Sequence, residues 1–492
     1  MIGIDVGHYC TKVISSEKLW EQLAQEQQYS FLSKITQQAS RVVVGDEVLS
    51  VLEQSQQATV FENFLSEILV DNPYAYLCDQ YVHGFDLAEL LFKKAQYYED
   101  QNLPVILSVA SYLTGEEKFA LALAAKRAQW QPKAVVASHL AKAIALMQKY
   151  RLEPESIFAV YDWGDRHFEV AIYKVGVQQK LELLASDYTL DVSGQKVNHK
   201  VWEIIARKYR QQRGRDLTES ILAVQDSKVH QSKLNADRYG RSSIEVRDYT
   251  IDLEQHELDD ALSDLIVLTV QKVEQVYRKA NVTAQMLKHT YITGGVTKLQ
   301  LIQKQLNEVL RGQLVVENSL GLEAKGAGLF GKNYLNSAEK LSFKYIEDQD
   351  TVTYLDRTLY HYGLMTAYYD ANLRQDIDRN LIVLERYQPL PAQVNLDLST
   401  DEPQQTSLDL QVSYAQQPSD QVQKVQWLPL QKIIFSHASN ALVPLEMKVE
   451  IDEQHRIILE VKNTFTGEKQ MVYQANALVE RFLNQSRHSL TV

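Results

Sequence analysis

Apolar and polar positions follow two different patterns along the chain. Up to about residue 335, short apolar runs such as residues 104–110 alternate with stretches such as residues 138–150, which have apolar residues at helical spacing. The runs are typical of buried strands, and the stretches are typical of helices that bury one face. From about residue 350 onward, short alternating segments are separated by turn residues, which predicts antiparallel strands. The pattern therefore predicts an α/β part followed by a β part.

The expected elements can be placed along both parts. In the α/β part, strands are expected at residues 1–6, 104–110, 134–137, 157–162, 168–174, 244–252 and 289–293. The strands at 157–162 and 168–174 flank a tight turn, which predicts a hairpin. Helices are expected at residues 115–129, where residues 114–117 (TGEE) fit a capping box, and at 138–150, 196–212, 217–235, 254–280 and 297–310. The β part has expected strands at residues 351–366, 380–387, 391–399, 405–414, 444–451 and 456–462, and one short helix is expected at 475–485.

Glycine and proline divide the chain at the same place. No proline occurs between residues 155 and 388, whereas six lie between Pro389 and Pro444. Glycine is scarce, with 19 in 492 residues, and only Gly363 and Gly467 follow residue 335. So little glycine leaves few places where the backbone can approach a phosphate closely, so the positions of the glycines are informative.

Charge and cysteine content exclude several classes of protein. The formal net charge of −12 argues against a chain-wide attraction to nucleic acid or to anionic membranes. The two cysteines, Cys10 and Cys78, cannot make a disulfide framework or a four-thiolate metal site. The chain start lacks a signal-peptide pattern, and no apolar run approaches the roughly 20 residues of a transmembrane helix. We expect a cytoplasmic protein that binds neither nucleic acid nor membrane.

Three turns at strand ends have the composition of phosphate-binding turns. They are residues 3–7 (GIDVG), 162–169 (DWGDRHFE) and 293–297 (TGGVT). Backbone N–H groups at such bends can point at a phosphate, and a nearby carboxylate can hold hydrated Mg²⁺. Each turn alone is a weak signal, but three in this order and at this spacing together indicate a nucleotide site.

These motifs resemble the actin-like ATPase superfamily and, within it, the heat-shock protein 70 (DnaK-type) chaperones. Residues 3–7 resemble the first phosphate loop, residues 162–169 the second, and residues 292–298 (ITGGVTK) the adenosine motif. Residues 321–331 (GLEAKGAGLFG) are similar to the helix that packs beside that motif. The resemblance implies a two-lobed α/β actin-like nucleotide-binding domain that binds ATP or ADP with Mg²⁺.

The C-terminal part separates this family from other actin-like proteins. Residues 447–461 (MKVEIDEQHRIILEV) and 466–470 are similar to the end of a DnaK-type antiparallel β-sandwich that binds peptides. The resemblance implies a nucleotide-binding domain at 1–335, a linker at 336–356 and a β-sandwich substrate-binding-like domain at 357–475. Residues 476–492 are expected to form a short C-terminal helix or tail and no helical lid.

Several site residues are implied residue by residue. Carboxylates at catalytic positions are Asp5, Asp162 and Glu169, and Asp5 and Asp162 are expected to hold the metal through water. Nucleotide contacts are expected from Gly7, His8, Tyr9, Gly164, Asp165, Arg166, Lys228, Ser232, Gly294, Gly295 and Val296.

Departures from the family pattern concern the hydrolysis step. Asn63 stands at the position of the expected lysine, Ser138 stands at that of the expected glutamate, and Glu169 replaces an aspartate. His8 and Tyr9 are bulkier than the family's small hydroxyl residues and are expected to crowd the phosphates. Ser138 cannot act as a base, so ATP hydrolysis is expected to be very slow or absent.

Two functions stay open at this point. The first is a divergent chaperone that binds nucleotide and an unfolded or partner polypeptide, with a co-chaperone as a further partner. The second is a pseudo-ATPase, in which the fold serves as an interaction scaffold or regulator. An actin-like kinase of small molecules is a third reading, against which the β part argues. Fold resemblance alone does not decide between them.

Overall fold

In the computed structural model the chain divides into two compact units, Met1–Val352 and a second that begins at Thr353. The structure describes residues 1–18, 29–54, 58–70, 72–99, 102–177, 181–214, 216–217, 226–246, 249–310, 313–317, 321–335, 352–355, 357–371, 373–400, 402–434, 440–453 and 455–475.

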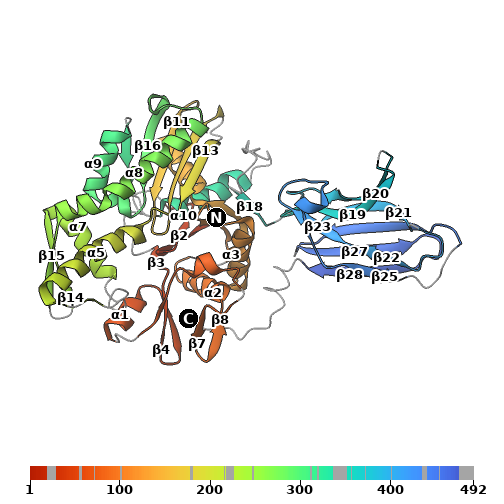
Figure 1. The fold of residues 1–492 in the computed structure, drawn as a ribbon, viewed down its shortest axis with the longest axis horizontal. Helices are drawn as coiled ribbons and strands as arrows, with labels where there is room; N and C mark the ends of the chain where they lie inside the picture. The colour runs from red at the N-terminus through yellow and green to blue at the C-terminus, as the bar shows by residue number, and fades with distance from the viewer. Residues whose placement is uncertain are drawn as a thin grey trace. The chain divides into compact units, whose positions relative to one another are not determined.

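The first unit contains a mixed sheet built around its N-terminal strand. Strand β1 (Ile2–Val6) is buried along its whole length. It pairs parallel with β9 (Pro104–Val109) and antiparallel with β2 (Cys10–Ser15). The sheet extends from β9 to β10 (Gln131–Ala137) and from β2 to β3 (Ser30–Leu32). Because β1 lies between β9 and β2, the turn after Val6 is held by strands on both sides. Strands β2 and β3 of this sheet are labelled near the N-terminus in Figure 1.

A second mixed sheet carries the other two predicted turns. Its strand order is β13 (Leu181–Thr189), β12 (Phe168–Val175), β11 (Ile157–Trp163), β16 (Leu287–Thr293) and β17 (Leu314–Val316). Strand β11 pairs antiparallel with β12, which confirms the predicted hairpin, and parallel with β16. In this register Asp162 stands opposite both Glu169 and Thr293, so the turns at 162–169 and 293–297 lie at the same sheet edge.

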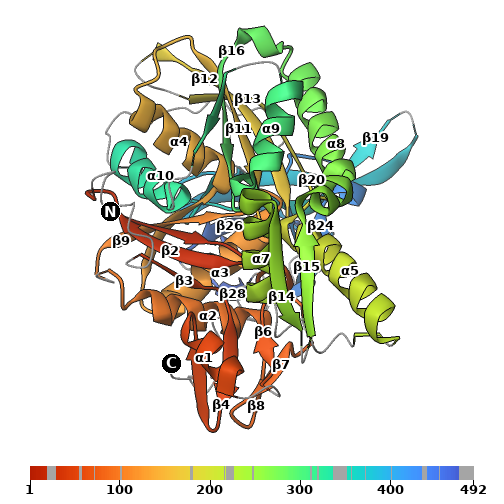
Figure 2. The same cartoon turned by 90° about the vertical axis from the view of Figure 1, so that its left-hand side faces the viewer.

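Helices α4 (Ser138–Tyr150) and α10 (Leu322–Phe330) pack closely and lie side by side in Figure 2. Close approach depends on glycine, because a Cβ on Gly326 would stand 1.8 Å from the carbonyl oxygen of Ala141. The same holds where α10 crosses β1, since a Cβ on Gly3 would stand 1.8 Å from the carbonyl oxygen of Ala324. Helix α10 therefore contacts both α4 and the first sheet.

The remaining elements of the first unit surround the two sheets. Its other helices are α1 (Glu47–Gln54), α2 (Gly84–Ala95), α3 (Gly115–Arg127), α5 (Gly194–Arg213), α7 (Asp226–Tyr239), α8 (Gln255–Lys279) and α9 (Gln300–Val309). The small strands are β4 (Ile35–Gln38), β5 (Arg41–Val44), β6 (Val60–Phe61), β7 (Ala75–Leu77), β8 (Gln80–Val82), β14 (Arg241–Val246) and β15 (Tyr249–Glu254). The capping box predicted before α3 is present, with Thr114 and Glu117 bonding each other's backbone N–H.

The second unit consists of antiparallel strands, as the alternating pattern predicts. One sheet has the order β20 (Gln375–Leu384), β19 (His361–Asp370), β23 (Val412–Ala415) and β24 (Gln426–Trp427). Another has the order β21 (Ala392–Ser399), β26 (Pro444–Ile451), β27 (Arg456–Asn463) and β28 (Lys469–Ala475). Strands β22 (Ser407–Leu410) and β25 (Gln431–Ile434) form a separate pair. Alternate residues of β26 and β27, such as Val449 and Leu459, are fully buried.

Some expected elements differ from those observed. The strand expected at 244–252 is the hairpin β14–β15, and the strand expected at 405–414 is two strands, β22 and β23. The strand expected at 351–366 contains β18 (Val352–Tyr354) and the first half of β19. Turns inside an apolar alternating run leave little trace in the sequence, because the alternation continues on both sides. Residue 475, the first of the helix expected at 475–485, ends β28, and the rest of that helix and most of the linker expected at 336–356 lie outside the described residues.

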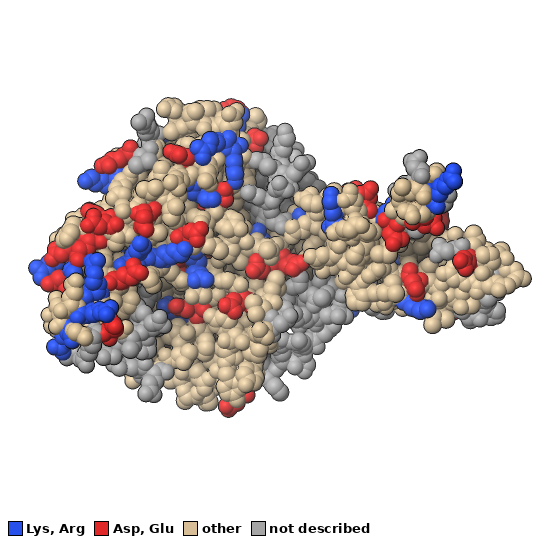
Figure 3. Space-filling model, in the orientation of Figure 1, with Lys and Arg blue, Asp and Glu red and all other residues tan. Residues whose placement is uncertain are grey.

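The surface carries both signs of charge. On the face shown in Figure 3, basic and acidic side chains are interspersed rather than gathered into one extended patch of one sign. In the part of the chain that the structure describes, no helix combines the length and the apolar character needed to cross a membrane.

Candidate functional site

The three predicted turns of the first unit line one cavity of about 250 Å³. The first turn leaves β1, the second joins β11 to β12, and the third follows β16. The structure brings these predicted residues to the cavity: Asp5, Gly7, His8, Tyr9, Ser138, Asp162, Gly164, Asp165, Arg166, Gly294, Gly295 and Val296. Turns from both sheets, which are distant from one another in sequence, thus contribute to one site.

Four predicted residues do not line this cavity. Glu169 is fully buried beside it, and the Asn63 side chain accepts a hydrogen bond from Gln195 Nε2 at 3.0 Å. On helix α7, Lys228 is exposed and Ser232 is buried, and the residues of this helix that line the cavity are His230 and Lys233. The helix predicted to contact the purine is therefore at the cavity, but through neighbouring positions.

Glycine at two neighbouring positions serves two different purposes. Gly294 has φ of +97°, and a Cβ there would stand 2.3 Å from the carbonyl oxygen of Trp163, so only glycine fits. Gly295 has an ordinary φ of −64°, and a Cβ there would meet no atom within 4 Å. Gly294 is required by the fold, whereas Gly295 leaves open space at the cavity wall.

Five charged side chains alternate in sign across the cavity, and we call them the ion-pair chain: Asp5, Lys12, Glu323, Lys142 and Asp162. Lys12 Nζ lies 3.0 Å from Asp5 Oδ2 and 3.2 Å from Glu323 Oε2. Lys142 Nζ lies 3.2 Å from Glu323 Oε1 and 2.6 Å from Asp162 Oδ2. Glu323, at the start of α10, therefore joins the two lysines.

Burial and ion pairing have opposite effects on the pKa values in this chain. Burial raises the pKa of Asp5, and it would also raise that of Glu323. For Glu323, Lys12 and Lys142 outweigh burial and lower the pKa to about 2. Burial alone would lower the pKa of Lys12, but Glu323 and Asp5 hold it well above its ordinary value. Both lysines are therefore ammonium ions at neutral pH, since the pKa of Lys142 is raised in the same way by Asp162.

The carboxylates expected to hold Mg²⁺ through water are both occupied by protein donors. Asp5 Oδ1 lies 3.2 Å from Ser108 Oγ, and Asp162 Oδ1 accepts a hydrogen bond from Thr293 Oγ1 at 3.0 Å. Their other oxygens contact the two ammonium groups. A divalent cation held by these carboxylates would lie next to two fixed positive charges, so the side chains as arranged do not fit it.

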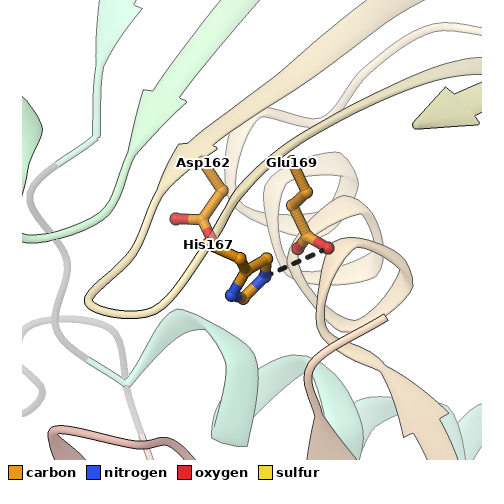
Figure 4. A group of neighbouring side chains, drawn as sticks. All are labelled: Asp162, His167 and Glu169. Carbon is orange, nitrogen blue, oxygen red and sulfur yellow. Dashed lines mark ion pairs between the residues drawn. The ribbon is translucent and has the colours of Figure 1, made fainter. Parts of the chain in front are cut away.

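Asp162, His167 and Glu169 form another group with the side-chain types of a metal site (Figure 4). Their possible ligand atoms lie within 4.8 Å of one another, and His167 Nε2 is 3.6 Å from Glu169 Oε2. Glu169 accepts hydrogen bonds from Ser138 Oγ at 2.6 Å and from Ser111 Oγ. Lys142 again provides a positive charge, at 2.6 Å from Asp162 and 4.0 Å from Glu169.

His8 and Tyr112 fill the space beside the first two turns. His8 Nε2 lies 2.5 Å from Tyr112 Oη, and the Tyr112 ring contacts the His167 ring edge-on. Burial, with His167 and Arg166 nearby, lowers the pKa of His8 to about 3, so its ring is neutral at pH 7. Tyr9 is partly exposed and stacks on His230 of α7.

Sequence reasoning missed Lys12, Lys142 and Glu323 as site residues. Lys142 has a signal, because it is the one charged residue among the ten buried residues from Ser138 to Met147. A lysine inside an apolar run must find an anion if the run is buried. The partner could not be found in the same way, because Glu323 is distant in sequence.

An α/β unit with two sheets and one cavity at their turns, followed along the chain by antiparallel β strands, has the architecture of an ATPase of the actin-like class with an added β region. Residues 77–476, more than half of the chain, match the family model described as Hsp70 protein. The chain therefore belongs to the Hsp70 family. Members of this family bind ATP or ADP with Mg²⁺ in the actin-like domain and bind polypeptides in the β-sandwich.

Proposed function

We propose that this protein is a divergent chaperone of the Hsp70 family that binds ATP or ADP in the cavity of its first unit. In this proposal a polypeptide client or partner protein binds the β domain at 357–475, and ATP hydrolysis is very slow or lost. In the same proposal the nucleotide-binding domain comprises residues 1–335, and residues 336–356 form the linker. The observation that carries the proposal is the convergence of the three glycine turns on one cavity.

Weak hydrolysis is supported by the contacts of the substituted residues. Ser138, at the position of the expected glutamate, has its hydroxyl 2.6 Å from Glu169, so it serves as a hydrogen-bond donor to a buried carboxylate. Asn63, at the position of the expected lysine, is bonded to Gln195. Neither contact supplies a general base or a cation to the reacting phosphate.

Binding of polypeptide is supported by apolar side chains that the β unit exposes. Ile434 on β25 is 60% exposed and Met471 on β28 is 50% exposed. These two strands meet here, because the Gln470 side chain bonds both the N–H and the carbonyl oxygen of Ile434. Exposed apolar residues on adjoining strands suit an extended apolar segment.

Nucleotide binding is tested by thermal unfolding with and without millimolar MgATP and MgADP. A ligand at 100 times its Kd stabilises the protein by about 2.7 kcal/mol and raises Tm. Gly295→Leu is the matched variant, because its side chain enters open space at the cavity wall without strain. We expect it to keep the unliganded Tm and to lose the nucleotide shift. A wild-type protein without any shift would contradict the proposal.

Polypeptide binding is tested by fluorescence anisotropy with a labelled apolar peptide. Ile434→Ser should weaken binding about tenfold or more, a loss of about 1.4 kcal/mol. Leu373→Ser is the control, because Leu373 is equally exposed but lies outside the β25–β28 contact. Equal losses in both variants would place the peptide elsewhere.

A pseudo-ATPase scaffold is the second candidate function. The observation that favours it is that Asp5 and Asp162, the carboxylates assigned to the metal, pair with lysine side chains of the protein. This candidate predicts no Tm shift with nucleotide, so the same measurement separates the two.

A further inference from the structure

We propose that Lys12 and Lys142 replace the divalent cation of this cavity, so that it binds the phosphates of a nucleoside di- or triphosphate without Mg²⁺. The inference rests on the proposed nucleotide binding and concerns the cation alone. It follows from the geometry of the ion-pair chain, in which both carboxylates assigned to the metal contact an ammonium group instead.

The charge of the cavity supports this replacement. Its basic lining residues are Lys12, Lys142, Arg166, Lys233 and Lys298. The same number of carboxylates lines it, namely the three of the ion-pair chain with Asp165 and Glu317. Formal charges therefore cancel. Without Lys12 and Lys142 the lining would carry two excess negative charges, which is the charge that one Mg²⁺ neutralises.

The two lysines have donor capacity left for an anion. An ammonium group offers three N–H donors. Lys12 lies within hydrogen-bond distance of two acceptors, Asp5 and Glu323, and Lys142 of two, Asp162 and Glu323, among the residues that the structure describes. One N–H of each lysine thus remains for a phosphate oxygen. Lys12 is the more accessible, since its side chain is 14% exposed and that of Lys142 is 2% exposed.

The arrangement also resists a return of the metal. Lys142 is surrounded by buried residues of α4, and the Asp162 and Glu323 carboxylates hold its ammonium group on two sides. Moving it away would leave a buried ammonium ion without a counterion and would remove the counterion of the buried Asp162 carboxylate. A divalent cation therefore has to bind beside Lys142 and cannot displace it.

The test is a calorimetric titration of the full chain with ADP and with ATP, once in Mg²⁺ and once in EDTA. We expect the two Kd values to agree within about threefold. Binding that is about tenfold or more tighter in Mg²⁺ would overturn the inference and leave the proposed function intact. An absence of nucleotide binding in both buffers would overturn this inference and the proposed nucleotide binding alike.

A metal titration without nucleotide supplies a second readout. With Mn²⁺ followed by electron paramagnetic resonance, the wild-type protein should bind no stoichiometric ion. Lys12→Met and Lys142→Met should each gain Mn²⁺ binding and a tighter Kd for ADP in Mg²⁺ than in EDTA. Lys208→Met is the matched control, because Lys208 pairs with Glu257 at 2.6 Å outside the cavity. Stoichiometric Mn²⁺ on the wild-type protein would contradict the replacement.

Discussion

The ion-pair chain makes a strong prediction about stability through Lys142. We consider Lys142→Met, which removes the charge and shortens the side chain by only one heavy atom. The side chains of Lys142 and Asp162 are 2% and 5% exposed, so solvent cannot replace the lost ammonium group. The variant leaves Asp162 with Thr293 as its remaining donor, and Glu323 with Lys12.

The expected loss follows from this burial. Removing one partner of a buried ion pair typically costs about 3–5 kcal/mol, because the other charge stays buried without its counterion. Asp162 and Glu323 each keep one donor, so we expect the lower end, about 3 kcal/mol. This corresponds to a roughly hundredfold larger unfolding constant. Lys208→Met should cost about 1 kcal/mol or less, because Lys208 is 21% exposed and its partner Glu257 is 13% exposed.

Urea unfolding followed by tryptophan fluorescence measures the loss. Trp130 and Trp163 are buried in the first unit, so their emission reports its transition. In the double variant K142M/D162N the unpaired charge is gone, and we expect it to recover at least about 1 kcal/mol of the single variant's loss. The reasoning would be refuted if Lys142→Met lost no more unfolding free energy than Lys208→Met. It would also be refuted if K142M/D162N lost as much as the two single variants K142M and D162N added together.

Three further predictions concern the same unit. Stability should fall as the pH drops from 6.5 toward 4, because burial lowers the pKa of His8 to about 3 and that of His139 to about 4 and the unfolded chain then binds more protons. Each such histidine contributes up to about 1.4 kcal/mol per pH unit, so the urea midpoints of His139→Gln should depend less steeply on pH than those of the wild type, and an unchanged slope would contradict this. Ser138→Glu should not restore ATP hydrolysis in a phosphate-release assay and should lower Tm. The Ser138 hydroxyl lies 2.6 Å from Glu169, so the new carboxylate would face a second buried one. An increased rate of phosphate release would contradict this. Gly294→Ala should cost at least about 2 kcal/mol in urea unfolding, because it combines a positive φ with a Cβ 2.3 Å from a carbonyl oxygen, and a neutral result would refute the strain.

Local sequence patterns predict much of this fold because they depend on local physics. The hairpin at 157–175 and the helix after Thr114 follow from alternation and from a cap, which neighbouring residues determine. The division of 244–252 into two strands does not, because the alternation continues through the turn. Strands β4 to β8 have four residues or fewer, which is too short for a periodic pattern of apolar and polar residues.

At the site, too, features determined by neighbouring residues were predicted, and contacts between distant residues were not. The glycine turns were predicted because each is a contiguous motif at a strand end. The contacts of Lys12 and Lys142 were not, since Glu323 is 311 residues from Lys12 in the chain and joins them only after α10 packs on β1 and α4. Asn63 was identified as the position of a missing cation, but its hydrogen bond to Gln195 spans 132 residues and requires the folded lobes.

The charges themselves bear on the choice between a nucleotide-binding protein and a scaffold. A buried ion-pair chain is no more stabilising than apolar side chains of similar volume, and replacing such pairs by apolar residues is often neutral or stabilising. A cavity that served only to hold the lobes together would gain nothing from five alternating charges, and apolar packing would fill it as well. Charges that line a cavity and cancel one another, with one N–H of each lysine left over, have a use when a charged ligand enters. The ion-pair chain therefore favours retained phosphate binding over a scaffold, even though the hydrolysis residues Ser138 and Asn63 have other partners.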